Sequence, residues 1–197
     1  GANVTLSYTK PDSSIVNRTV VTETDGSFQD AYMPDMPGAW SLKASWAGDK
    51  DHNGTESLQV QFEVLTDLMH EVTWDSAVYF IRTLSNSSVS DFFFNGAALR
   101  IGFNVSGPLG TEGFCNVTIP KNLLQGDPWT ITIDDTPITN SIQTENGTHT
   151  FLYLTYTHPS TLQVIIQGTW IIPEFPSFII LPLFTIATLL IVIAYRR

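Results

Sequence analysis

The C-terminal end constrains the fold of this chain most, because it carries an apolar run that no solvent-exposed loop would have. Phe178 to Tyr195 contains no charged residue, and Arg196-Arg197 follows directly. An uncharged run of this length, with apolar residues on every helical face, is typical of a membrane-spanning helix. A buried core helix at the end of a domain is the alternative. We predict a single transmembrane helix over 178–195.

The predicted span is short. Its 18 residues would reach about 27 Å as a helix, against about 30 Å of hydrocarbon core, and Pro182 inside it would produce a kink. Arg196 and Arg197 form a basic stop that the positive-inside bias places in the cytoplasm. Residues 1–172 would then lie outside the cell. We therefore predict a single-pass protein of the cell membrane with an extracellular N-terminal region and a C-terminus that is cytoplasmic before any processing.

Asparagine sequons support an extracellular location. The pattern Asn-x-Ser/Thr, with no proline in the middle, occurs seven times, where chance predicts about two. A β protein rich in Thr and Asn could also accumulate sequons by composition alone. We predict a glycosylated outer surface. The candidate glycosylation sites are Asn3, Asn17, Asn53, Asn86, Asn104, Asn116 and Asn146.

Composition excludes other classes of function. The formal net charge is −10, and without the two terminal arginines seven basic residues face nineteen acidic ones, a net charge of −12. Such a surface repels nucleic acid, so no nucleic-acid partner is expected. Cys115 is the only cysteine. No intrachain disulfide can form, and the fold must be held by packing alone.

Residues 1–65 alternate between apolar and polar side chains, as half-buried strands do. Asp25-Gly26 predicts a hairpin turn between Val20–Glu23 and Ser27–Tyr32. About five strands result, whereas a complete immunoglobulin-like sandwich has about seven strands in about 100 residues. The inward-facing sets are Val4, Leu6 and Tyr8, then Trp40, Leu42, Ala44 and Trp46, then Leu58, Val60, Phe62 and Val64.

This N-terminal unit is therefore expected to be truncated at its start. Gly1-Ala2-Asn3-Val4 has neither the basic nor the apolar region of a signal peptide. A secreted precursor needs such a signal, so we expect the chain to be the C-terminal part of a longer protein. A complete tail-anchored cytosolic protein is the alternative, against which the sequons argue.

Three stretches of this unit carry a family resemblance. They are Val4-x-Leu6-x-Tyr8-x-x-Pro11, then Val21-Thr22-x-Thr24-Asp25-Gly26-x-Phe28, then Pro37-Gly38-x-Trp40-x-Leu42-x-Ala44-x-Trp46-x-Gly48-Asp49. Together they resemble the immunoglobulin-like repeats of archaeal and bacterial surface proteins. The resemblance implies a stalk or adhesion module and no chemistry.

Residues 67–170 show a second β-rich pattern. Short alternations are separated by turns with Gly, Pro or Asn, which is typical of a β-sandwich. Phe151 to Thr157 predicts a further strand, and Asn104 is expected on the polar face of its strand. The inward-facing sets are Leu99, Ile101, Phe103 and Val105, then Trp129, Ile131 and Ile133, then Leu162, Val164 and Ile166.

The C-terminal tail carries a second resemblance. Pro173-Glu174-Phe175-Pro176, the apolar span and the terminal arginine pair resemble the PEF-type C-terminal sorting signal of archaeal surface proteins. Gly113 to Lys121 and Thr148 to Tyr153 resemble a membrane-proximal domain that often precedes such a tail. The resemblance implies an archaeosortase as partner, which reads Pro173–Pro176, cuts there and passes the protein to a membrane lipid. Alternatively, the two prolines merely end the last strand before a permanent anchor.

Two groups of residues invite a chemical interpretation. Asp49-Lys50-Asp51-His52-Asn53-Gly54 opens like a calcium loop, but the twelfth position is Val60 instead of Glu. A weak metal site at Asp49 and Asp51 is therefore a candidate beside an ordinary acidic turn. Cys115 with His149 or His158 could form a nucleophile and base, although a structural thiol explains Cys115 more simply. We expect no enzyme, no catalytic residue and no cofactor.

The sequence thus predicts an all-β protein: two immunoglobulin-like β-sandwich domains, at 1–65 and 67–170, followed by a linker with the sorting motif at 173–177, one transmembrane helix and a basic stop at 196–197. The expected function is a structural or adhesive one at the cell surface, with other surface proteins or glycans as partners. Two alternatives remain. The chain could be the anchoring base of an extracellular enzyme or substrate-binding protein, or a cation- or glycan-binding module that uses the Asp49–Asp51 turn.

Overall fold

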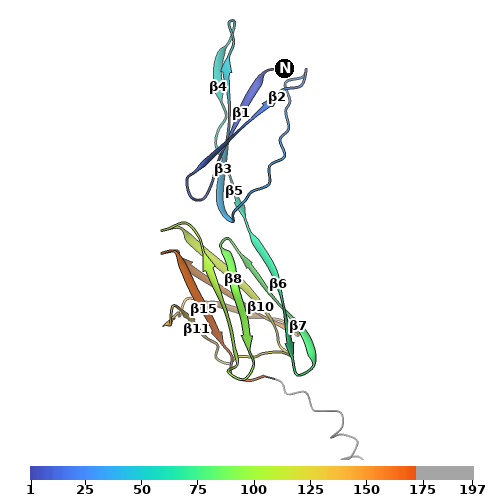
Figure 1. The fold of residues 1–197 in the computed structure, drawn as a ribbon, viewed down its shortest axis with the longest axis vertical. Helices are drawn as coiled ribbons and strands as arrows, with labels where there is room; N and C mark the ends of the chain where they lie inside the picture. Colours follow the sequence, from blue (N-terminus) through green and yellow to red (C-terminus); the bar gives the residue numbers. More distant parts are fainter. Residues whose placement is uncertain (172–197) are drawn as a thin grey trace, which may run out of the picture.

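The structure is a computed structural model that describes residues 1–171. Within these residues every regular element is a β-strand, which confirms the all-β prediction for this part of the chain. The strands form two units stacked end to end along a rod (Figure 1). Gly1 lies at the far end of the rod, and the described chain leaves the second unit at the opposite end.

The N-terminal unit is one antiparallel sheet in the order β2-β1-β3-β4, with β5 also paired to β3. Alternation along the central strands points Val4, Leu6, Tyr8 and Trp40 to one face, where each is buried. The strands are β1 (Asn3–Thr9), β2 (Ile15–Val21), β3 (Gly38–Gly48), β4 (Asn53–Glu56) and β5 (Val60–Val64).

A segment without strands covers this apolar face in place of a second sheet. Tyr32 and Met36 pack on the core, and the indole Nε1 of Trp40 donates to the carbonyl of Met36 at 3.0 Å. Asp30 accepts two hydrogen bonds of 2.7 Å from Arg18 and one of 3.0 Å from the Tyr8 hydroxyl. The covering segment is thereby fixed to the sheet by side chains.

The N-terminal unit therefore differs from the two-sheet sandwich expected for residues 1–65. The turn at Asp25-Gly26 does form, with the Glu23 amide donating to the Ser27 carbonyl at 2.7 Å. Residues 27–32 do not continue as a strand, because Asp30 is held over the sheet by Arg18 and Tyr8. The apolar face also stays open on the β5 side, where Val60 and Phe62 are exposed, and Leu58 falls between two strands.

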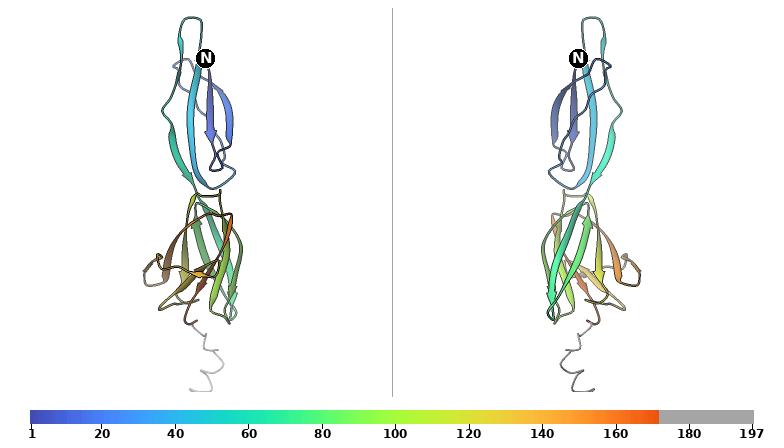
Figure 2. Two further views of the ribbon diagram at one scale, coloured as in Figure 1. Left: turned by 90° about the vertical axis from the view of Figure 1, so that its left-hand side faces the viewer. Right: turned by 90° about the vertical axis from the view of Figure 1, so that its right-hand side faces the viewer.

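The second unit is a sandwich of two five-stranded antiparallel sheets, in the orders β13-β14-β10-β7-β6 and β12-β11-β15-β9-β8. Figure 2 shows the sheets as two layers in both side views. The first sheet contains β6 (Thr66–Trp74), β7 (Ala77–Ser85), β10 (Glu112–Pro120), β13 (Ile142–Glu145) and β14 (His149–Thr157). The second contains β8 (Ser88–Asn95), β9 (Arg100–Ser106), β11 (Thr130–Ile133), β12 (Thr136–Pro137) and β15 (Thr161–Gln167).

Inward side chains of both sheets fill the space between these layers. The predicted inward positions of β9 and β15 are buried, with Ile101, Val105, Val164 and Ile166 fully enclosed. Phe92 and Phe94 pack on the same core while Phe93 points outward, as expected of a strand with one wet face. Leu99 lies just before β9 with φ of 55° and is only partly buried, so the predicted inward run begins at Ile101.

Within residues 1–171 the structure contains no helix long and apolar enough to cross a membrane. The predicted helix at 178–195, the motif at Pro173–Pro176 and the stop at Arg196 and Arg197 lie outside the described residues.

We predict that the sandwich core carries most of the stability. Leu154→Ala removes a fully enclosed side chain and should cost about 2–5 kcal/mol. Leu109→Ala makes the same chemical change at a side chain that is 79% exposed. It should change the free energy of unfolding by no more than about 0.5 kcal/mol. Urea unfolding followed by tryptophan fluorescence measures both. Equal losses for the two variants would contradict this account of the core.

Candidate functional site

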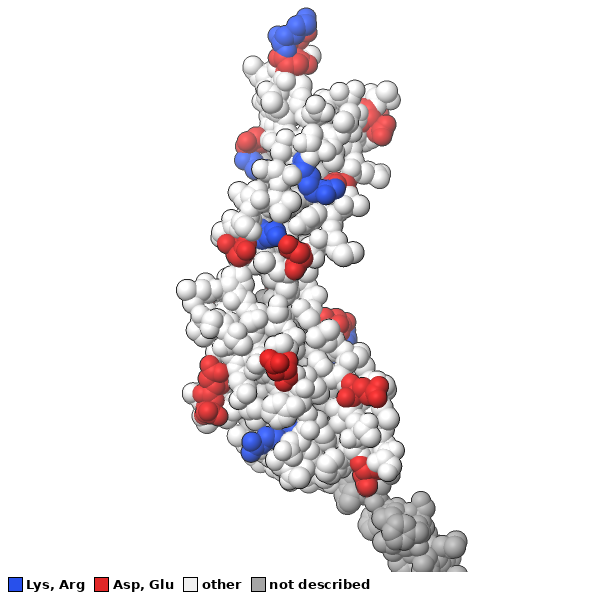
Figure 3. Space-filling view, in the orientation of Figure 1, with Lys and Arg blue, Asp and Glu red and all other residues white. Residues whose placement is uncertain are grey.

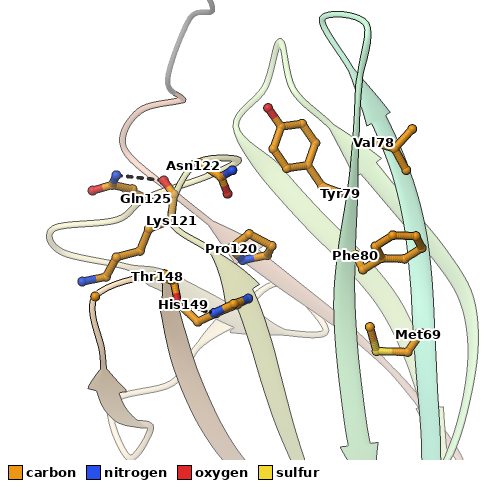
Figure 4. A pocket seen from close by; sticks show the side chains of 11 residues that line it. Met69, Val78, Tyr79, Phe80, Pro120, Lys121, Asn122, Gln125, Thr148 and His149 are labelled. Atoms are coloured by element: carbon orange, nitrogen blue, oxygen red, sulfur yellow. Dashed lines mark hydrogen bonds between the residues drawn. The ribbon is translucent and has the colours of Figure 1, made fainter.

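An open groove of about 660 Å³ lies beside the first sheet of the sandwich (Figure 4). Met69, Val78 and Phe80 on β6 and β7 form its apolar side. The connection after β10 and the start of β14 form its polar side. The polar residues are Lys121, Asn122, Gln125, Thr148 and His149.

The polar side of the groove is committed to local contacts. Lys121 pairs with Glu145 at 3.0 Å, and Gln125 donates to the Lys121 carbonyl at 2.8 Å. The hydroxyl of Thr148 contacts Nδ1 of His149 at 2.8 Å. A base and a hydroxyl do meet here, but on an exposed turn without a third group to orient the imidazole among the described residues. The groove thus offers an open surface on which the side chains of Lys121, Gln125 and Thr148 are engaged by their neighbours.

Sequence reasoning missed a buried Ser–His contact at the other end of the sandwich. The Ser87 hydroxyl lies 2.8 Å from Nε2 of His158. Thr111 donates its hydroxyl to the Pro108 carbonyl at 2.7 Å, and its oxygens lie 2.9 and 3.1 Å from Nδ1 of His158. This network assigns the proton to Nδ1 and leaves Nε2 to accept from Ser87. No sequence signal joins residues 71 positions apart, so only the fold could show it.

The Ser87–His158 pair has the distance of a nucleophile and base but lacks access. Ser87 is fully buried and His158 is 2% exposed. The Tyr156 hydroxyl closes the network from inside, 3.0 Å from Ser87 and 3.3 Å from Ser85. Burial raises the pKa of Tyr156 to about 12, although the two serine hydroxyls act in the opposite direction. The network satisfies buried polar groups, as a structural role requires.

The candidate pairing of Cys115 with a histidine is not formed. Cys115 points into the sandwich opposite Leu154, whereas His149 lies at the other end of the β10–β14 pair, opposite Pro120. The ring nitrogens of His158 are engaged by Ser87 and Thr111. Burial raises the pKa of the Cys115 thiol to about 12, which removes the thiolate that a nucleophile needs.

The candidate metal residues Asp49 and Asp51 form a turn. Oδ1 of Asp49 accepts from the backbone amides of Asp51 and His52, both at 2.8 Å, and lies 2.9 Å from Nδ1 of His52. The hydrogen bond from the Asp51 amide, followed by the contact with the His52 ring and then the His52 amide, lowers the pKa of Asp49. Asp51 pairs with Lys50 at 3.1 Å. In the described part of the chain no group of three or more His, Cys, Asp or Glu side chains is placed to hold a metal ion.

The structure separates the seven sequons into two groups. Four asparagines are exposed along the rod: Asn3, Asn17, Asn53 and Asn146. Three are half-buried: Asn86, Asn104 and Asn116. Nδ2 of Asn104 donates to Asp91 at 2.8 Å. The two groups therefore differ in how freely the nitrogen that carries an N-linked glycan can be reached.

Asn86 joins the two units. Its Nδ2 donates to Oε1 of Glu63 in the N-terminal unit at 2.9 Å and to the Glu112 carbonyl at 3.2 Å. Its Oδ1 accepts from the Phe114 amide at 2.8 Å. A cavity of about 320 Å³ lies beside these contacts, lined by residues of both units. Asn86 is thus a structural link at the junction, a role that sequence reasoning did not foresee.

Comparison of this chain with protein-family models, with curated proteins and with solved structures found no match.

We predict that sequon occupancy follows this division. A glycan on Asn86 would displace the hydrogen bonds to Glu63 and Glu112, so Asn86 should remain unmodified while Asn17 and Asn146 are occupied. Glycopeptide mass spectrometry of the protein from its native host measures each site. Full occupancy of Asn86 would contradict its assignment as a junction residue.

We predict a loss of stability at alkaline pH that depends on two buried groups. The pKa values of Cys115 and Tyr156 rise on folding, from 9.0 and 10.0 to about 12. The unfolded chain therefore loses these protons first. Their contribution is fully present below pH 9 and declines as pH rises toward about 12.

The double variant Cys115→Ala/Tyr156→Phe lacks both groups. Its free energy of unfolding should fall less steeply than that of the wild type between about pH 9 and about pH 11, by up to about 1.4 kcal/mol per pH unit for each proton. Urea titrations across this range compare the slopes, so a constant loss of packing in the variant does not matter. Parallel pH profiles would refute the assignment.

Proposed function

We propose that this chain is the membrane-anchored, N-glycosylated stalk of a cell-surface protein with a structural or adhesive role. The observation that carries the proposal is the direction in which the chain runs along the rod. The N-terminus lies at one end, and the described chain leaves the second unit at the other, with both β units stacked between them (Figure 1). Anything joined to the N-terminus would be held away from whatever holds the C-terminus.

The junction supports a spacer role. Only Leu65 separates β5 from β6, and a linker of one residue leaves little slack between the units. The Asn86–Glu63 hydrogen bond adds a side-chain contact across the same junction. A short, bonded joint transmits orientation along the rod better than a long flexible linker does.

The surface of the rod also fits a protein that stays solvated outside the cell. Figure 3 shows the charged side chains in small separate groups on a largely uncharged surface. The four exposed sequons are distributed over both units, at Asn3, Asn17, Asn53 and Asn146. Glycans at these positions would supply the hydration that few charges provide.

The anchor is proposed from the tail sequence. Pro173 and Pro176 restrict their own φ and bias the preceding residue toward extended geometry, which suits a segment read by a sorting enzyme. Arg196 and Arg197 would resist passage through lipid. We infer an archaeosortase substrate that is cut near Pro173–Pro176 and transferred to a lipid.

Mass spectrometry of the mature C-terminus from native membranes tests the anchor. A terminus between residues 172 and 177 that carries a lipid is the expected result. Peptides that extend through Arg197 as the dominant form, in cells that contain an archaeosortase, would identify a permanent single-span anchor instead. If neither the cut chain nor the chain that extends through Arg197 is found in membranes, anchoring is refuted altogether.

A further inference from the structure

The outer side of the first sandwich sheet carries a row of aromatic and aliphatic side chains on its solvent face. Directly opposed residues in paired strands share a face. The register places Leu84, Asn116, Tyr153 and Ile142 in one row across β7, β10, β14 and β13. Phe151 lies opposite Thr118 in the next row.

Rings flank this row closely. Phe114 stacks on Tyr153 with ring centroids 5.6 Å apart and planes inclined by 27°. Phe114, Phe151 and Tyr153 are each only half-buried, and Ile142 is 58% exposed. We call Phe114, Phe151, Tyr153 and Ile142 the aromatic face. The aromatic face thus places partly exposed apolar side chains on three neighbouring strands, β10, β14 and β13.

A sequon lies in the middle of the aromatic face. Phe114, Asn116 and Thr118 are two residues apart on β10, so all three point to the same side of the sheet. The residues between them, Cys115 and Val117, are fully buried. The acceptor asparagine, the hydroxyl that completes the sequon and one ring of the face are therefore neighbours on one surface.

The side-chain amide of Asn116 differs in its hydrogen bonding from the side-chain amides of the other two half-buried sequons. Nδ2 of Asn86 and of Asn104 donates to protein carboxylate or carbonyl oxygens. The side chain of Asn116 makes no hydrogen bond within the described residues, and its Oδ1 is buried without a partner. Such an oxygen is costly unless a donor reaches it. Nδ2 of Asn116 donates to no oxygen of the described residues, so a sugar attached there would break no hydrogen bond of the protein.

We propose that the aromatic face is covered by the chain's own glycan, attached to Nδ2 of Asn116. This inference rests on the proposed glycosylation of the outer surface and goes further, because it names the occupant of one surface. The C–H face of the first sugar packs on Phe114 and Tyr153. The glycan is then a packed part of the fold, whereas glycans on the exposed sequons extend into solvent.

Periodate oxidation of the native, folded full chain tests the proposal, because it cleaves vicinal diols of accessible sugars. Glycopeptide mass spectrometry follows Asn116 and Asn17 in the same sample. Asn17 is the control, because it is an exposed strand sequon. We expect the sugar next to Asn116 to react about fivefold more slowly than the one at Asn17, the order that one packed ring supplies.

Two variants test the contribution of the rings. Phe114→Leu and Tyr153→Leu keep an apolar side chain but remove an aromatic ring, and each should bring the rate at Asn116 toward that at Asn17. Slow alkylation of the buried Cys115 thiol reports that the variant is folded. If a variant unfolds, the comparison of the two sites in the wild-type chain still decides.

The outcomes distinguish the glycan-covered aromatic face from the more general proposal of a glycosylated surface. Equal oxidation rates at Asn116 and Asn17, or an occupied Asn17 beside an unmodified Asn116, would overturn the glycan-covered face and leave the glycosylated surface intact. An absence of glycans at all seven sequons would refute the glycosylated surface and this inference with it.

Discussion

The structure depends on the packing of two sheets in a chain that has no disulfide to support them. The core between these sheets includes Ile81, Ile101, Ile119 and Leu154, all fully enclosed, and the nine-residue register between β10 and β14 holds its centre. A shift of one residue in that register would turn the whole inward set to solvent. The buried polar groups at the ends of these strands must therefore find hydrogen-bond partners without a change of register. The Ser87–His158–Thr111 network does so at the junction end, and Asn86 extends it with a contact to the N-terminal unit.

The N-terminal unit has less support of this kind. One sheet with an irregular cover buries four side chains, Val4, Leu6, Tyr8 and Trp40, and relies on Asp30 to fix the cover through Arg18 and Tyr8. That arrangement leaves Val60, Phe62 and Leu58 exposed on the β5 side. A small unit with a partial core gains stability from a fixed neighbour, since the Asn86–Glu63 contact is available only when the second unit is folded.

Alternation predicted the strands well, because a period of two is a local property of the chain. The inward sets of β1, β9 and β15 and the buried state of Cys115 follow from it. The strand predicted for residues 27–32 does not form, because their conformation depends on the tertiary contact between Asp30 and Arg18. The turn at Asp25-Gly26 that precedes them forms as predicted. The Ser87–His158 contact and the role of Asn86 could not be predicted either, since both join residues far apart in sequence. The chemical interpretation of Asp49 was a local one, and the structure gives its carboxylate a local use in capping the turn.

The two-residue period of a β-strand can itself explain some of the sequons. Asn3-Val4-Thr5, Asn104-Val105-Ser106 and Asn116-Val117-Thr118 each place a buried valine between two outward polar residues. A half-buried strand that alternates Asn, Val and Thr produces a sequon as a by-product of its own pattern. The alternative, that sequons arise from composition alone, therefore applies best to these three sites. It applies least to Asn53 and Asn146, which belong to turns or to the strand ends beside them. Occupancy of a strand sequon needs an argument of its own. At Asn104 the engaged amide argues against a glycan, and at Asn116 the unpartnered amide and the adjacent rings argue for one.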